Sequence, residues 1–358
     1  MALARVQGIL SRRWVRIAGL YLISLVAIYF VVSFLVPKSS EIAAISKVLN
    51  DAQSWQIVVA VVLELGSISA FALSTWSLVR RRPRVTRRWM IALTMASTAI
   101  GNSLPLGAGV TTVYAYRKLV RRGVSRRESG VAIGAANVIA IATLAFLTVF
   151  FTIVGEDSGT ASGSVSLLTL VGLGALVLVC GLVLWKIEPI ARASAAAWVY
   201  GRTRIGGPAK DARNAARMAY ARRDPLELPM RTLARSVGYG LGNWGLDLSA
   251  LFVALFIARA HVSILGVISA YVIGALAANL PITPGGLGVV EGSLAVSLVA
   301  FGGAQVQVLA GVLIYRLVSF WIWLPLGWIS HFTLAFLERR EGNGAASAVT
   351  TVDSREKC

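Results

Sequence analysis

Four ionisable side chains lie inside long apolar stretches of the sequence: Glu64, Asp247, Glu291 and Arg316. Charged groups in an apolar environment are costly, and they tend to serve as ion sites, proton relays or ligand contacts. Arg316 lies near the middle of an apolar run, too deep for its side chain to reach water easily. It therefore needs an internal acidic partner, a cluster of carbonyl groups or an anionic ligand.

Glu291 follows a turn rich in proline and glycine at 281–288 (PITPGGLG), at the expected start of a helix, where the helix dipole favours a carboxylate. The glycines allow the backbone to turn and leave N–H groups facing a cavity at the positive helix end. Together with Arg316, this predicts a site for a phosphate-bearing headgroup. A structural alternative stays open, in which the glycines serve only the turn and Glu291 and Arg316 form a buried clamp.

Glu64 and Asp247 each lie in the apolar segment that precedes a broken one, and we expect them to tune a polar cavity or to carry a proton. The alternative is that they bond across helices to Ser67, Asn243 or a nearby backbone group. The predicted headgroup-binding or transport site combines the charged residues with those of two sequence breaks: Arg316, Glu291, Gly285, Gly286, Gly288, Pro281, Pro284, Asn279, Asn102, Pro105, Gly107, Glu64 and Asp247.

The sequence carries no signature of an enzyme. It has no nucleophile beside a histidine, no H-E-x-x-H motif and no phosphate-binding loop, so we expect no catalytic residue and no cofactor. Cys180 and Cys358 have no metal-ligand spacing, and no metal is expected. The net charge of +19 does not indicate nucleic-acid binding, because the basic residues lie in short loops between apolar runs.

The elements that position these residues are transmembrane helices. Hydrophobic residues make up 56% of the 358-residue chain and charged residues 14%, against about 25% charged residues in soluble domains. A helix needs about 20 apolar residues to cross a bilayer. The expected spans of this all-α integral membrane fold are 14–36, 54–79, 129–154, 164–185, 236–257 and 305–330.

Two further apolar stretches, about 89–116 and 262–301, are broken by proline and glycine. Arginine and lysine flank the first stretch on both sides (80–88 and 117–127), so both of its ends are expected in the cytoplasm. This predicts a re-entrant helical hairpin, with a second hairpin of opposite orientation at 262–301, as in inverted-repeat transporters. The alternative is that one or both stretches are ordinary pairs of spans.

The remaining segments are expected to be cytoplasmic. Residues 1–13 form a basic N-terminus, 14–335 the polytopic membrane domain with a basic cytoplasmic loop at 186–235, and 336–358 a disordered tail. Both termini are placed inside the cell.

The sequence resembles the lysylphosphatidylglycerol synthase transmembrane (flippase-like) family. The resemblance is carried by 281–291 (PITPGGLGVVE) with 315–321 (YRLVSFW), and more loosely by 102–107 (NSLPLG) with 116–125. It implies a membrane domain that in some relatives moves an aminoacylated phospholipid from the inner to the outer leaflet. Members with synthase activity add a soluble aminoacyl-transferase domain. This sequence ends soon after its last span, so that activity is not expected.

The predicted function is that of a non-enzymatic lipid flippase or lipid-handling transporter in a bacterial plasma membrane, whose partner is a phospholipid or another anionic lipid. Without an ATP site, a gradient or the removal of product supplies the energy. One alternative is an accessory subunit whose basic loop docks a separate glycosyl- or acyl-transferase. The other is a transporter of small solutes or ions. At 110–114 (VTTVY) the chain departs from many relatives, which have an acidic residue and an arginine there.

Overall fold

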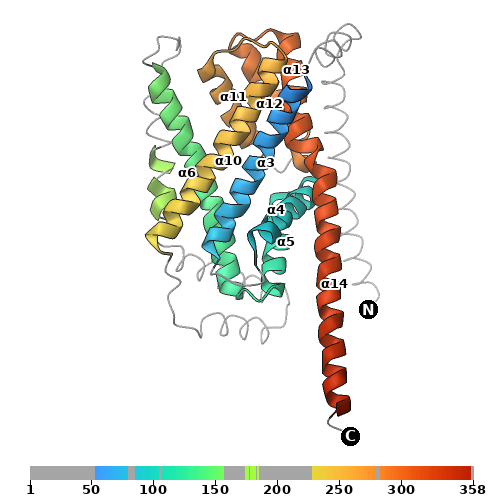
Figure 1. The fold of residues 1–358 in the computed structure, drawn as a ribbon. Helices are drawn as coiled ribbons and strands as arrows, with labels where there is room; N and C mark the ends of the chain where they lie inside the picture. Colours follow the sequence, from blue (N-terminus) through green and yellow to red (C-terminus); the bar gives the residue numbers. More distant parts are fainter. Residues whose placement is uncertain are drawn as a thin grey trace, which may run out of the picture.

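The structure is a computed structural model, and it describes residues 53–79, 85–104, 107–156, 174–176, 178–182, 184, 228–278 and 283–355. These residues form helices and short turns, with no strand among them (Figure 1). The predicted all-α class is therefore confirmed for this part of the chain. The predicted span 14–36, the N-terminus 1–13, and most of 164–185 and of the loop 186–235 lie outside the described residues.

The long helices agree with the predicted spans. They are α3 (Ser54–Leu78), α6 (Arg126–Glu156), α10 (Met230–Ile257), and α13 (Gln305–Arg316), which continues through a π-helical turn, η2 (Leu317–Trp321), into α14 (Trp323–Arg355). Four helical stretches of the described chain are long and apolar enough to cross a membrane: 54–78, 126–151, 230–257 and 305–340. They correspond to the predictions 54–79, 129–154, 236–257 and 305–330.

Helix α14 extends past the predicted end of the membrane domain. It remains helical through Arg355, so the prediction of a disordered tail from 336 differs from the structure over this range. The physical reason lies in the residues that follow the expected boundary. Glu338 is held by a salt bridge at 2.8 Å to Lys118, and the alanine-rich stretch 345–348 that follows favours helix.

The first broken stretch folds into a hairpin of two short helices, α4 (Arg87–Asn102) and α5 (Gly107–Arg121). The helices approach closely at their inner ends, because a Cβ atom on Gly107 would lie 2.1 Å from the carbonyl oxygen of Gly101. Their outer ends share one apolar core with the end of α3 and the start of α6, including Leu78, Trp89, Leu119 and Val131. Both ends of this hairpin therefore lie at the same end of the molecule.

The second broken stretch forms a matching hairpin, from α11 (Ile264–Ala278), the short 3-10 helix η1 (Pro284–Gly286) and α12 (Val289–Ala300). Its outer ends pack with the end of α10 and the start of α13 in a second core that includes Leu255, Val267, Leu298 and Val308. In Figure 1, α11 and α12 lie in the upper part of the molecule, and α4 and α5 lie lower down. The two hairpins thus occupy opposite ends of the bundle.

Helices α3 and α10 run side by side through the centre (Figure 1). Small and polar side chains join them: the hydroxyl oxygens of Ser74 and Ser236 are 2.7 Å apart, and the Ser67 hydroxyl donates to Asn243 Oδ1 at 3.3 Å. Hydrogen bonds of this kind connect helices where the surrounding lipid provides no partner. This helix pair forms the wall against which both hairpins are placed.

Helix α14 holds the first hairpin from the outside. A Cβ atom on Gly327 would lie 2.4 Å from Ala99 Cβ, so the two helices touch there. The Trp328 indole N–H donates to Ser103 Oγ at 3.2 Å, next to the end of α4. Near the outer end of α5, the buried Lys118 ammonium donates to both carboxylate oxygens of Glu338 at 2.8 Å.

The contribution of the Lys118–Glu338 pair to stability can be tested against a matched control, Arg121. Arg121 contacts the same carboxylate at 3.8 Å, but its side chain is 70% exposed. Replacing Lys118 by Ala removes two charge-assisted hydrogen bonds from a buried site, which should lower the free energy of unfolding by about 1–3 kcal/mol. Arg121→Ala should change it by less than about 1 kcal/mol. Thermal unfolding in detergent measures both variants, and equal losses would contradict the packing described.

Candidate functional site

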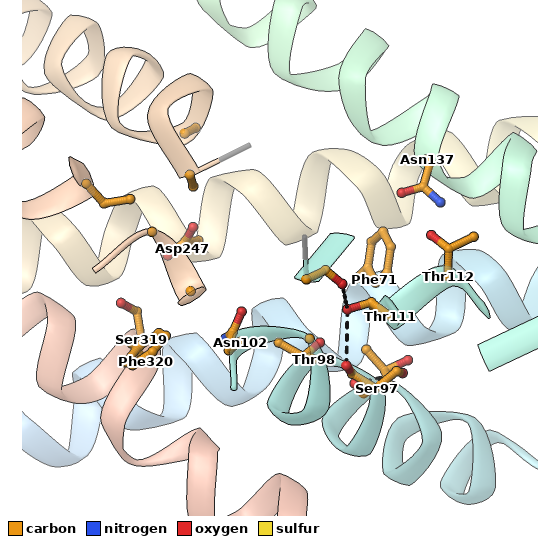
Figure 2. A pocket seen from close by; sticks show the side chains of 18 of the residues that line it. Phe71, Ser97, Thr98, Asn102, Thr111, Thr112, Asn137, Asp247, Ser319 and Phe320 are labelled. Atoms are coloured by element: carbon orange, nitrogen blue, oxygen red, sulfur yellow. Dashed lines mark hydrogen bonds between the residues drawn. The ribbon is translucent and has the colours of Figure 1, made fainter. Parts of the chain in front are cut away.

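A cavity of about 700 Å³ lies between the two hairpins and the central helix pair. This is within the range of about 300–1,000 Å³ that is usual for ligand pockets. Its described lining comes from α3, α4, α5, α6, α10, both parts of the second hairpin, α13 and η2. Figure 2 shows Asp247, Ser319 and Phe320 toward one end, and Thr111, Thr112 and Asn137 toward the other. The cavity therefore has a charged end and an end of neutral hydrogen-bonding groups.

The charged end is built around an ion pair between Arg316 and Glu291. Arg316 Nε donates to Glu291 Oε1 at 2.5 Å, and both side chains are buried, at 9% and 4% exposure. The other carboxylate oxygen, Oε2, accepts from the backbone N–H of Gly288 at 2.6 Å. The carboxylate thus caps the start of α12 and neutralises the arginine at the same time. The predicted partnership of Glu291 and Arg316 is confirmed.

Arg316 also fixes the glycine-rich turn and faces the cavity. Its Nη2 donates to the carbonyl oxygen of Gly285 at 3.2 Å, and its guanidinium lies 4.5 Å from the centre of the Phe320 ring. A guanidinium has five N–H donors, so these contacts leave donors for a ligand. Arg316 ends α13, and the π-helical turn that follows places Ser319 and Phe320 along the cavity wall. Such turns within α-helices often mark functional sites.

The turn itself requires glycine at three positions. Gly285, Gly286 and Gly288 have φ of 61°, 68° and 79°, which are left-handed values that side chains disfavour. Pro284 begins η1, where its missing N–H costs nothing. A Cβ atom on Gly285 would also lie 2.4 Å from the Phe320 ring. These residues therefore shape the turn, as the structural alternative predicted.

The expectation that the N–H groups of the turn face the cavity is not met at three of them. The N–H groups of Gly286 and Leu287 donate within the turn, to the carbonyls of Thr283 and Pro284 at 3.2 Å and 3.3 Å. The N–H of Gly288 is bonded to Glu291. These three amides are therefore already used as donors within the turn and its cap.

The tips of the two hairpins meet beside Arg316. A Cβ atom on Gly285 would lie 3.1 Å from the carbonyl oxygen of Asn102, at the end of α4. Asn102 and Gly107 both line the cavity, and so do Gly285 and Gly286. Of the predicted site residues, Asn279, Pro281 and Pro105 lie outside the described part of the chain.

Glu64 and Asp247 lie against each other at the same end of the cavity, one from α3 and one from α10. The two side chains proposed as alternative partners, Ser67 and Asn243, form a hydrogen bond with each other. Asp247 instead accepts hydrogen bonds from two tyrosines: Tyr271 donates to Oδ2 at 2.6 Å and Tyr315 to Oδ1 at 2.8 Å. Glu64 Oε2 is buried and has no hydrogen-bond partner.

Sequence reasoning missed both tyrosines and the whole neutral end of the cavity. A tyrosine inside an apolar segment is itself a signal, because its buried hydroxyl requires a partner. Ser97, Thr98, Thr111 and Thr112 carry no such signal. Several of these hydroxyls bond to backbone carbonyls nearby, as Thr111 does to Gly107 at 2.9 Å and to Ser97 at 3.1 Å (Figure 2). A hydroxyl that donates to a carbonyl keeps oxygen lone pairs with which it can accept a further hydrogen bond.

Comparison with known proteins identifies one family. The model of the lysylphosphatidylglycerol synthase TM region matches residues 17–327, which is most of the chain. No curated protein matches it. Within the described residues, no group of three or more His, Cys, Asp or Glu is placed to hold a metal ion.

The turn provides a direct test of the site geometry. Gly285→Ala forces a side chain into left-handed backbone and against Phe320, which should cost about 1–3 kcal/mol of stability. Gly292→Ala is the matched control, because it lies in α12 with nothing within 4 Å of an added Cβ. This change should be neutral or stabilise by about 0.5–1 kcal/mol. Thermal unfolding of both variants in detergent is the measurement, and an unperturbed Gly285→Ala protein would refute the described turn.

Proposed function

The chain belongs to the lysylphosphatidylglycerol synthase TM family, and from this premise we propose that it is a membrane transporter that moves or handles a phosphate-bearing lipid headgroup. The observation that carries the proposal is the cavity between the two hairpins, with Arg316 exposed to it at one end and neutral hydroxyl and amide groups at the other. A guanidinium is the side chain best suited to recognise a phosphate. Hydroxyl and amide groups suit the polar remainder of a headgroup, while the acyl chains stay in the lipid.

The proposed arrangement in the membrane follows the chain's helices. The four long apolar stretches cross the bilayer, and the hairpins α4–α5 and α11–α12 enter it from opposite sides as re-entrant elements of an inverted repeat. Their tips then meet inside the bilayer, where irregular backbone is tolerated only when buried in protein or lining a cavity. The membrane is the bacterial plasma membrane, with the basic segment around Arg87 and Arg121 on its cytoplasmic side.

The site offers binding rather than bond-breaking chemistry. The polar side-chain groups among the described lining residues are hydroxyls, amides, an indole, one guanidinium and two carboxyls. They position and neutralise a headgroup, and nothing in the proposed mechanism requires a covalent step. The proposed protein therefore changes the leaflet of a lipid and not its chemistry. Incubation with charged tRNA and phosphatidylglycerol should yield no aminoacylated lipid.

Lipid movement is tested by reconstitution into vesicles that contain a trace of lipid labelled on an acyl chain. The lipids compared are phosphatidylglycerol, its lysyl ester and phosphatidylcholine, and a reagent added outside reports the fraction of label in the outer leaflet. The proposal expects movement of at least one of the first two lipids. A protein that moves none of them, but releases trapped small solutes, would instead be a solute transporter.

Filling the cavity should stop this movement. Thr98 lies on α4 at the neutral part of the cavity, so Thr98→Trp puts an indole where the headgroup must pass (Figure 2). We expect the rate to fall by at least about tenfold, which corresponds to about 1.4 kcal/mol in the barrier. Val113→Trp on α5 is the control, because Val113 is 48% exposed on the outside of the same hairpin. Equal rates for both variants would contradict passage through the cavity.

A further inference from the structure

The charged end of the cavity holds more acid than base. Its described lining contains Glu64, Asp247 and Arg316, and the described residues of α4, α5 and α6 that line it carry no acid or base. The charge of Arg316 is already balanced by Glu291, at 2.5 Å. If Glu64 and Asp247 were both ionised, this buried end would carry two uncompensated negative charges. Two carboxylates in contact within a low-dielectric site cannot both remain charged.

The hydrogen bonds around the pair decide which carboxyl is ionised. Both oxygens of Asp247 accept from tyrosine hydroxyls, Oδ2 from Tyr271 and Oδ1 from Tyr315. A carboxylate accepts at both oxygens, whereas a protonated carboxyl has turned one of its oxygens into a donor. Asp247 is therefore the member of the pair that is solvated as an anion.

Glu64 has the opposite surroundings. Its side chain is 5% exposed, it lines the cavity, and no group donates to its buried Oε2. It lies beside Asp247, across the contact between α3 and α10, and both side chains line the cavity. A buried carboxyl oxygen that lacks a donor and has an acceptor nearby is accommodated when it carries the proton itself.

We propose that Glu64 and Asp247 form a proton-binding site. Glu64 carries one proton, and its O–H group donates a hydrogen bond to the Asp247 carboxylate. Release breaks the Glu64 O–H bond and passes the proton to water or to a basic group in the cavity, and rebinding reverses this step. The site itself stands on its geometry. Its use in transport, where headgroup movement is coupled to proton movement, rests on the proposed function.

The groups that face the pair come from every helix around it. Tyr271 belongs to α11, Tyr315 and Arg316 to α13, and Glu291 of α12 acts through Arg316. When Glu64 loses its proton, the site gains a negative charge. Arg316 is the nearest basic group that can balance this charge. Protonation of Glu64 therefore alters how strongly Arg316 is drawn toward a phosphate, and this links the two sites.

Infrared spectroscopy of the full chain in lipid tests the site without any transport. At neutral pH the wild-type protein should show the C=O stretch of a protonated carboxyl, shifted by exchange into D₂O. Glu64→Gln should abolish this band, and Tyr271→Phe should shift it, because a donor to Asp247 is lost. Glu128→Gln, at a buried glutamate in the first turn of α6, should leave it unchanged.

Two infrared results would overturn the proposal. One is the absence of a protonated carboxyl band from the wild type. The other is a band that survives both Glu64→Gln and Asp247→Asn. A wild-type protein without the band, but stabilised against unfolding by Na⁺, would show a metal cation at the pair in place of a proton.

Coupling is then measured in vesicles with a trapped pH-sensitive dye. A pH gradient should drive lipid accumulation in one leaflet by the wild type, while Glu64→Gln should only equilibrate the leaflets. If the wild-type protein distributes lipid between the leaflets in the same way with and without the pH gradient, the proposed coupling is wrong. If no lipid moves but the infrared band behaves as described, the proton site stands and the proposed lipid transport fails.

Discussion

The arrangement of the second hairpin and the last helices depends on the ion pair that neutralises one buried arginine, Arg316. Arg316 ends a helix inside the apolar core of the bundle, where a lone charge costs about 2.5–3.5 kcal/mol on insertion scales. Its partner, Glu291, comes from the second hairpin and also caps the start of α12. A single carboxylate thus fixes the hairpin, the turn and the last long helix relative to one another. This contact keeps the hairpin tip beside α13, where Gly285, Gly286 and Arg316 line the cavity.

The last helix unites the two hairpins. Through Arg316 it holds the second hairpin, and through Gly327, Trp328 and Glu338 it holds the first. Its segments pack against α4 of the first hairpin and α12 of the second, and the tips of both hairpins line the cavity. The clamp and the ligand-contact interpretations of Arg316 are therefore compatible, because the contacts that hold the turn use only some of its donors.

The sequence predicted those parts of the site that depend on residue types unusual in apolar segments. The arginine in an apolar segment predicts an acidic partner among the three carboxyls of such segments, and proline with glycine predicts the breaks that form the hairpin tips. A tyrosine in an apolar segment signals that its hydroxyl needs a partner, but that Tyr271 and Tyr315 both meet Asp247 depends on how α10, α11 and α13 pack. The neutral end of the cavity could not be predicted from the sequence either. Hydroxyls such as those of Ser97 and Thr111 bond to nearby carbonyls and look like ordinary helix residues.

The most direct test of the account is a double-mutant comparison at Arg316 and Glu291, measuring thermal unfolding in detergent and movement of the lipid that the wild type moves. Arg316→Leu and Glu291→Leu should each lose about 3–5 kcal/mol of stability, because each leaves an unpaired buried charge. The double change should regain most of this stability, as apolar pairs do in place of buried ion pairs. It should still move no lipid, because the guanidinium that meets the phosphate is gone. Wild-type lipid movement by the double variant would contradict the account.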